Sequence, residues 1–213
     1  MSILIDGKAT SDKIKCQIAQ QVKEIVEKGG KQPHLAAILV GEDGASKTYV
    51  GHKEKACNQV GFKSTIFKFP ADITEAFLLE QIDQINKDED IDGLIVQLPL
   101  PKHIDENKVI EAIDPKKDVD GFHPQNVGKM MLNLPTFLPA TPYGIVRLLE
   151  EYNIPTKGKH TVVLGRSNIV GRPISNLLSL KEKVGDSTVT ICHSRTQNLA
   201  DICGYSVSYS GFF

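Results

Sequence analysis

The sequence predicts an α/β protein in which helices and strands alternate around largely parallel sheets. Several segments carry apolar residues at the spacing of one helix face. Between them lie short continuous apolar runs bounded by glycine or proline, as expected for buried parallel strands. The two kinds of segment alternate through most of the 213 residues. Repeated βα alternation in a chain of this length favours two α/β units.

The first half of the chain contains most of the expected elements. The first helix ends at Gly29-Gly30, and its apolar face consists of Ile14, Ile18, Val22, Ile25 and Val26. Strands are expected over residues 35–40, 62–69 and 94–98, and helices over 46–60, from Thr74 and over 106–113. Ser46 and Thr74 are the expected N-caps, because a hydroxyl oxygen can accept a bond from a free N–H of the first turn.

The segment 135–142 contains three prolines and is the expected domain boundary. It divides the chain into domains 1–139 and 140–213. Thr141-Pro142 fits an N-cap followed by proline at the first helical position. The helix that follows has Ile145, Leu148, Leu149 and Tyr152 on one face. A strand over 161–164, a helix near 173–180 and a strand over 188–192 complete the series.

Composition excludes several classes of partner. Lys and Arg total 25 against 26 Asp and Glu, so a net charge of −1 gives no general attraction to nucleic acid or an anionic membrane. The four cysteines form no CxxC pair, which favours reduced thiols over a metal site or disulfide framework. Asp6 interrupts any signal-peptide core, and no apolar run approaches the ~18 residues of a membrane helix. We expect a cytoplasmic protein.

The segment from Gly165 to Gly171 lies between an expected strand and an expected helix, where a Rossmann fingerprint would stand. The glycines are six residues apart, which differs from the usual GxGxxG spacing. Gly165 still permits a tight turn, and backbone N–H groups at the helix start can receive a pyrophosphate. The alternative is a tight turn with two surface arginines.

The strand over 188–192 is followed by Ser194 and Arg195 and by no acidic residue, whereas NAD-selective enzymes hold the ribose 2′-hydroxyl with a carboxylate there. Glu182 and Asp186 precede the strand and so lie at its amino end, whereas nucleotides bind at the carboxyl end. Arg195 and Arg166 without a carboxylate suit a 2′-phosphate, so the sequence predicts NADP as the cofactor.

Four side chains in the first half are candidates for substrate chemistry. Tyr49 and Lys53 are four apart on an expected helix and share a face. An aromatic ring can stack on a flat heterocycle, and a lysine can transfer protons where burial or neighbours lower its pKa. The alternative is a solvated lysine above a half-buried tyrosine. Gln97 could equally anchor a loop, and Asp120 could be a turn residue.

Five segments occur in one order along the chain. They are Tyr49-x-x-x-Lys53, Val-Gln-Leu-Pro-Leu-Pro at 96–101, Lys-Asp-Val-Asp-Gly at 117–121, Pro-Ala-Thr-Pro at 139–142 and Gly-Arg-Ser-x-x-Val-Gly-x-Pro at 165–173. This order resembles the bifunctional methylenetetrahydrofolate dehydrogenase/methenyltetrahydrofolate cyclohydrolase family, from about residue 3 to about residue 201.

The resemblance implies a folate-binding α/β domain, a Rossmann-like NADP-binding domain and a cleft between them. It implies oxidation of 5,10-methylenetetrahydrofolate by NADP⁺ and hydrolysis of the methenyl product to 10-formyltetrahydrofolate, a one-carbon donor for purine biosynthesis. Family members are typically homodimers that pair through their cofactor domains. A dehydrogenase without the hydrolysis step is disfavoured, because Lys53 and Gln97 are both present.

The resemblance also implies a role for each site residue. Lys53 would handle protons in the hydrolysis, positioned by Gln97, while Tyr49 would stack on the folate ring system. Asp120 would accept hydrogen bonds from the N–H edge of the pterin. The residues implied for the cofactor are Gly165, Arg166, Ser167, Ser194 and Arg195.

The pattern fades after Leu199. We expect a strand near residues 200–202 and a tail from about Cys203 that is not native to the fold. The Rossmann-like domain then has two strands, ending at Leu164 and Cys192, and is incomplete. A truncated chain of this kind could be a folate-binding module without turnover, which is the alternative function.

Overall fold

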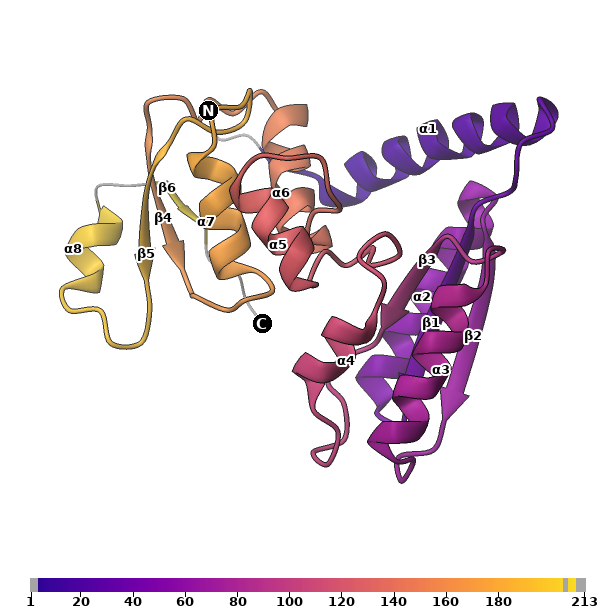
Figure 1. The fold of residues 1–213 in the computed structure, drawn as a ribbon. Coiled ribbons are helices and arrows are strands. Elements are labelled where there is room, and N and C mark those ends of the chain that lie inside the picture. Colours follow the sequence, from indigo (N-terminus) through magenta and orange to yellow (C-terminus); the bar gives the residue numbers. More distant parts are fainter. Residues whose placement is uncertain (1–3, 205–206, 210–213) are drawn as a thin grey trace. The chain divides into compact units, whose positions relative to one another are not determined.

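The computed structural model describes residues 4–204 and 207–209 and divides into two compact units (Figure 1). The N-terminal unit is Lys8–Val119. The C-terminal unit begins at Asp120 and also includes the start of the chain up to Gly7. The units therefore divide earlier in the chain than the predicted boundary at 139/140. The domain limits 1–139 and 140–213 stay a prediction.

The N-terminal unit is built on a parallel sheet with strand order β2-β1-β3. The strands are β1 His34–Val40, β2 Lys63–Phe69 and β3 Gly93–Val96. The helices are α1 Gly7–Glu27, α2 Gly44–Val60, α3 Glu75–Lys87 and α4 Glu106–Ala112. The expected strands and helices of this half are all present.

The central strand β1 is buried on both faces. Ala36, Ile38 and Val40 pack into a cluster with the α3 residues Leu78, Ile82 and Ile85. The intervening residues Ala37 and Leu39 pack on the other face, with Val50 of α2. Burial on both faces explains why the strand reads as a continuous apolar run rather than an alternating one.

The N-cap of α2 is Asp43, and the prediction of Ser46 was wrong. The Asp43 carboxylate accepts a hydrogen bond of 2.7 Å from the backbone N–H of Ser46. That bond holds the pKa of Asp43 below its usual range. A carboxylate suits this position because the helix N-terminus carries a partial positive charge. Thr74 does cap α3, where its hydroxyl accepts from the Phe77 N–H at 3.1 Å.

The C-terminal unit has a second parallel sheet, with strand order β5-β4-β6. Its strands are β4 His160–Leu164, β5 Thr188–Cys192 and β6 Val207–Tyr209. Its helices are α5 Pro124–Met131, α6 Ala140–Glu151, α7 Gly171–Ser179 and α8 Leu199–Gly204. Its core is formed by Leu149, Val163, Ile174, Leu178 and Val184.

The end of the chain differs from the prediction in two ways. The sheet has a third strand, because β6 pairs in parallel with β4. The segment 200–202, expected as a strand, belongs to helix α8. The N–H groups of Asp201 and Ile202 both donate to the Asn198 carbonyl, which starts a helical turn instead of a strand.

Two helix starts also differ from the prediction. Helix α6 begins at Ala140 after Pro139, without a side-chain cap, so Thr141 is not the N-cap. Helix α5 was not predicted. It has only eight residues, and its start is fixed by Pro124 and by the ring of His123, which accepts the Gln125 N–H.

None of the helices in the part of the chain that the structure describes combines the length and apolar character of a membrane span.

Candidate functional site

The structure brings Lys53 and Gln97 together, although they are 44 residues apart in sequence. The Lys53 Nζ donates to the Gln97 Oε1 at 3.3 Å. Lys53 lies on α2, the helix that follows β1, and Gln97 directly follows β3. Both side chains are half-buried, so the lysine is neither free in solvent nor enclosed in the core.

Gln97 is held firmly by its own main-chain and side-chain bonds. Its backbone N–H donates to the Ile38 carbonyl of β1 at 2.9 Å. Its side-chain Nε2 donates to the Leu98 carbonyl at 2.7 Å, which leaves Oε1 as the atom that faces Lys53. A lone-pair oxygen in this position can hold the lysine amine in one place and orient its hydrogens.

Tyr49, Lys53 and Cys57 follow one another at four-residue intervals on α2. Their exposure falls along this face: Tyr49 is 61% exposed, Lys53 is half-buried and Cys57 is 5% exposed. The tyrosine ring therefore lies open to a ligand one helical turn before the lysine. Burial raises the pKa of the Cys57 thiol, so that side chain is a protonated core residue rather than a nucleophile.

Asp120 is half-buried and begins the C-terminal unit. The next residue, Gly121, has a φ of +68° and lies against the Pro-Ala-Thr-Pro segment. A Cβ on Gly121 would lie 2.8 Å from the backbone nitrogen of Pro139, so only glycine fits. Two of the five motif segments therefore pack against each other, and this packing fixes the backbone next to Asp120.

The turn after β4 is shaped by two glycines. Gly165 has a φ of +128°, and nothing lies within 4 Å of the point where its Cβ would be. Gly171 approaches the same turn so closely that a Cβ would lie 2.4 Å from the Gly165 carbonyl oxygen. Gly165 leaves open space beside its backbone, and Gly171 allows the helix to start against the turn. Rossmann glycines perform both of these functions.

Ser167 stabilises this turn by accepting hydrogen bonds from the residues that follow it. Its Oγ accepts from the N–H groups of Val170 and Gly171, each at 3.2 Å, and its carbonyl accepts from Arg172. The amides at the start of α7, which we expected to receive a pyrophosphate, are therefore already bonded. Within the described residues, the free amides are those of positions 166–169 in the turn itself. Consecutive free amides of this kind can hold phosphate oxygens.

The predicted cationic residues lie at one edge of the second sheet. Leu164 and Cys192 pair in register, and the Gly165 N–H continues the ladder to the Cys192 carbonyl at 2.7 Å. Arg166 and Arg195 follow these strands and therefore leave the sheet at the same carboxyl edge. Both are exposed, and neither forms an ion pair with any residue that the structure describes.

The loop after β5 carries Ser194 and Arg195 between two residues that bond to each other. The His193 N–H donates to the Thr196 Oγ1 at 2.8 Å, and the Thr196 N–H donates to the His193 carbonyl at 2.8 Å. The Arg195 N–H donates to the His193 Nδ1 at 3.2 Å. Sequence reasoning missed His193 and Thr196, and it did not assign Gly171 to the cofactor site.

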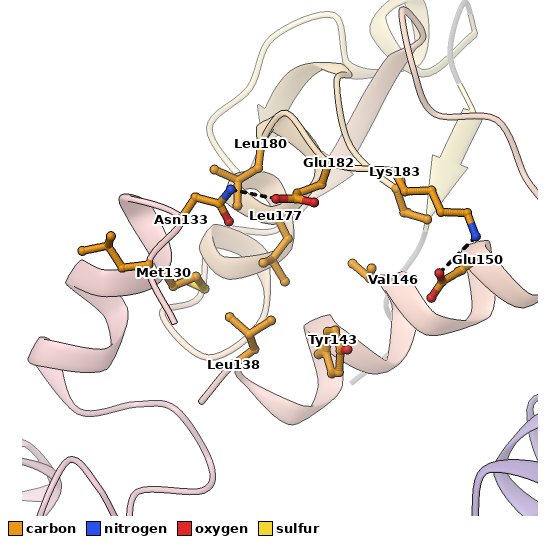
Figure 2. A pocket seen from close by; sticks show the side chains of 12 residues that line it. Met130, Asn133, Leu138, Tyr143, Val146, Glu150, Leu177, Leu180, Glu182 and Lys183 are labelled. Atoms are coloured by element: carbon orange, nitrogen blue, oxygen red, sulfur yellow. Dashed lines mark hydrogen bonds and ion pairs between the residues drawn. The ribbon is translucent and has the colours of Figure 1, made fainter. Parts of the chain in front are cut away.

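A separate cavity of about 260 Å³ lies in the C-terminal unit and contains none of the predicted site residues. Figure 2 shows side chains of α5, α6 and α7 around it, including Met130, Tyr143 and Leu177. Asn133 donates to Glu182 at 2.7 Å and Lys183 to Glu150 at 3.2 Å at its rim. These polar groups bond to each other, so the cavity offers mainly an apolar wall.

The residues at the carboxyl edge of the second sheet fit a phosphorylated nicotinamide cofactor. Gly165 leaves space beside its backbone, and the amides of 166–169 bond to no group among the described residues. The side chains of Arg166 and Arg195 form no ion pair with any described residue. The N-terminal unit adds a held lysine–glutamine pair beside an exposed aromatic ring. These features are typical of an α/β protein with a nucleotide-binding unit and a second unit whose lysine–glutamine pair is of a kind that can transfer protons.

The family model for the tetrahydrofolate dehydrogenase/cyclohydrolase catalytic domain matches residues 5–120, and that for the NAD(P)-binding domain matches residues 139–206. The chain is 60% identical over 200 residues to the bifunctional protein FolD of Porphyromonas gingivalis. The matched region covers 94% of this chain and 68% of the relative. The chain belongs to the tetrahydrofolate dehydrogenase/cyclohydrolase family. The predicted family and the two-domain α/β class are confirmed.

Solved structures agree. The FolD dehydrogenase/cyclohydrolase of Campylobacter jejuni has a TM-score of 0.89 and 44% identity, over 94% of this chain and 70% of its own. The Trypanosoma brucei enzyme, solved with NADP and an inhibitor, has a TM-score of 0.91 and 33% identity, over 99% of this chain and 72% of its own. The identity exceeds what fold similarity alone would require.

Proposed function

We propose that this chain oxidises 5,10-methylenetetrahydrofolate with NADP⁺ and hydrolyses the 5,10-methenyltetrahydrofolate that results to 10-formyltetrahydrofolate. The observation that carries the proposal is the Lys53–Gln97 hydrogen bond beside the exposed Tyr49 ring. It supports proton transfer next to a flat heterocycle, in a chain whose relatives are named as bifunctional enzymes of this class.

Lys53 acts in the hydrolysis. Water adds to the methenyl carbon between the two folate nitrogens, and the bond from that carbon to N5 then breaks. One proton is released overall, and the Lys53 amine is the group that moves protons at the reacting carbon. Gln97 holds this amine through Oε1, and its own amide is fixed by the Leu98 carbonyl.

Tyr49 and Asp120 bind the folate. The Tyr49 ring is exposed one turn before Lys53 and offers a face on which the pterin can stack. The Asp120 carboxylate accepts the paired N–H groups of the pterin edge, which bidentate geometry favours. The packing of Gly121 against Pro139 holds the backbone that carries this carboxylate.

The C-terminal unit would hold NADP, which would supply the hydride acceptor for the oxidation step. Gly165 and the free amides of the turn would hold the pyrophosphate, and the Ser167 hydroxyl proton would be available to a phosphate oxygen. Arg166, Ser194 and Arg195 would hold the 2′-phosphate, because two guanidinium groups and a hydroxyl match its charge and its acceptors. NADP in the Trypanosoma brucei neighbour supports this choice of cofactor.

Absorbance of the methenyl intermediate tests both activities in one cuvette. We expect the chain to form it from 5,10-methylenetetrahydrofolate with NADP⁺ much faster than with NAD⁺, and to accelerate its decay when it is added alone. Folate binding by calorimetry without either reaction would contradict the proposal and support the module without turnover.

The family resemblance also favours three further properties of this protein. We propose a homodimer formed through the C-terminal units, a cytoplasmic location and a supply of one-carbon units to purine biosynthesis. Neither nucleic acid nor a membrane is expected as a partner, given the net charge of −1. Light scattering across a concentration series measures the oligomeric state, and a constant monomer mass would refute the dimer.

A further inference from the structure

The loop after β5 is held by the residues at its two ends. His193 and Thr196 exchange two hydrogen bonds of 2.8 Å, one from the backbone N–H of His193 to the Thr196 hydroxyl and one between backbone groups. The His193 ring adds a third bond, because its Nδ1 accepts the Arg195 N–H at 3.2 Å. Both end residues are half-buried, as expected of groups that fix a loop.

The two residues between them are presented outward. Ser194 and Arg195 are exposed, and their side chains bond to no other residue that the structure describes. Their positions therefore depend on the backbone conformation that His193 and Thr196 impose. A long arginine side chain can reach a ligand from many backbone positions, whereas the short Ser194 hydroxyl and the loop amides cannot.

We propose that His193 and Thr196 are positioning residues that determine selectivity for the 2′-phosphate of NADP over the 2′-hydroxyl of NAD. The inference rests on the proposed function, which assigns the 2′-phosphate to Arg166, Ser194 and Arg195. Within that assignment, the His193 ring selects the cofactor without touching it. It does so by accepting the Arg195 N–H, which fixes the Ser194–Arg195 peptide at the carboxyl edge of the sheet.

The hydrogen bond that His193 Nδ1 accepts can be tested separately from the packing of the His193 ring. A ring nitrogen that accepts the Arg195 N–H must carry a lone pair, so the neutral ring has its proton on Nε2. Asparagine can accept the same N–H through its side-chain oxygen, since Asx-turns bond to the backbone two residues on. Phenylalanine keeps a ring of similar bulk but has no acceptor. Rescue by asparagine and loss with phenylalanine would therefore report the hydrogen bond itself.

The experiment titrates the whole chain with adenosine 2′,5′-bisphosphate and with adenosine 5′-monophosphate and compares their dissociation constants. We expect the unmodified chain to prefer the bisphosphate. His193→Phe and Thr196→Val should reduce that preference about tenfold, the effect of one net hydrogen bond at the upper end of its range. His193→Asn should keep it within about twofold. Affinity for the monophosphate should not change in any variant.

His160→Ala is the matched control, because His160 begins β4 at the opposite edge of the same sheet and its Nε2 contacts Thr190 Oγ1 at 2.8 Å. It should leave the preference unchanged. If the unmodified chain binds both nucleotides equally, the assignment of the 2′-phosphate, and with it the proposed cofactor, is wrong. A normal preference that survives in His193→Phe overturns the positioning role alone. A parallel loss of monophosphate affinity also overturns it, since the pair would then support the whole site.

Discussion

Gln97 and the Gly165–Gly171 turn each directly follow a strand of a parallel sheet, but the Lys53–Gln97 site and the turn differ in the kind of group that forms them. The first site depends on two side chains, a lysine amine and an amide oxygen 3.3 Å apart. The turn depends mainly on backbone, with glycines that remove side chains and free amides at 166–169 among the described residues. Substitutions should therefore act through chemistry at the first site and through shape at the second.

The largest expected effect is at the side-chain site. Lys53→Met should reduce hydrolysis of methenyltetrahydrofolate by about 10²–10⁴-fold, the usual contribution of a positioned acid–base group. The measurement is the decay of methenyl absorbance. Lys55→Met is the matched control, because Lys55 is an exposed lysine of the same helix. Hydrolysis at the parental rate by Lys53→Met would remove the lysine from the mechanism.

The backbone site should respond to the addition of a single methyl group. Gly171→Ala places a Cβ 2.4 Å from the Gly165 carbonyl oxygen. We expect a loss of about 1–3 kcal/mol in the free energy of unfolding, together with weaker NADP binding, as the overpacked turn shifts. Denaturant titration and nucleotide calorimetry measure the two effects.

Gly128→Ala is the control for this substitution, because a Cβ at Gly128 in α5 meets nothing within 4 Å. That variant should be neutral or more stable, by up to about 1 kcal/mol, since alanine restricts the unfolded chain. Equal behaviour of the two glycine variants would show that the close approach at Gly171 has no consequence.

Charge at the edge of the second sheet should affect selectivity more than stability. Arg166→Glu should reduce the preference for NADP⁺ over NAD⁺ by about tenfold or more, because it replaces a charge-assisted hydrogen bond with repulsion of the 2′-phosphate. Initial rates with both cofactors give the ratio. Lys181→Glu makes the same charge change at an exposed position outside the turn and should leave the ratio unaltered. A proportional loss with both cofactors would refute the 2′-phosphate role of Arg166.

The smallest effect is expected at the start of α2. The bond from the Ser46 N–H lowers the pKa of Asp43 in the folded chain. The hydrogen bond from the Ser46 N–H therefore contributes fully to the free energy of unfolding at pH values above the pKa that Asp43 has in the unfolded chain. This contribution is lost as the pH falls through the lower pKa that Asp43 has in the folded chain. Asp43→Asn keeps a cap oxygen but does not titrate, so its stability should fall less steeply below about pH 4. Denaturant titrations of both proteins across the acid range measure this, and identical pH dependence of Asp43→Asn and the parent would contradict it.

Most of the fold could be predicted because burial leaves a clear pattern in the sequence. The residues of β1 alternate between two buried faces, so the strand appears as one apolar run. Helix α5 left no such pattern, since it has eight residues and is started by Pro124 and the His123 ring. The third strand of the C-terminal sheet was missed because we recognised no family pattern in the tail, although Val207 and Tyr209 are residue types that favour strands.

The parts of the candidate site that consist of side chains could be predicted from the sequence, whereas those that depend on backbone contacts could not. The four-residue spacing of Tyr49 and Lys53 places them on one face, but only the resemblance joined Lys53 to Gln97, because spacing does not reveal contacts between distant segments. The function of Gly171 depends on a carbonyl oxygen six residues earlier, which is visible only in three dimensions. His193 and Thr196 had a signal that was overlooked, since polar residues three apart at a strand end can bond to each other's backbone.

The contact between Gly171 and Gly165 also limits how this protein can vary over evolutionary time. The atom that a Cβ at Gly171 would strike is a main-chain oxygen, and every amino acid at position 165 carries that oxygen. No substitution at position 165 can therefore compensate directly for a larger residue at 171. Relief requires a change in the path of the backbone, and such a change would also move the amides to which we assign the cofactor phosphates. Position 171 is thus closed to gradual change even though its residue offers no functional group.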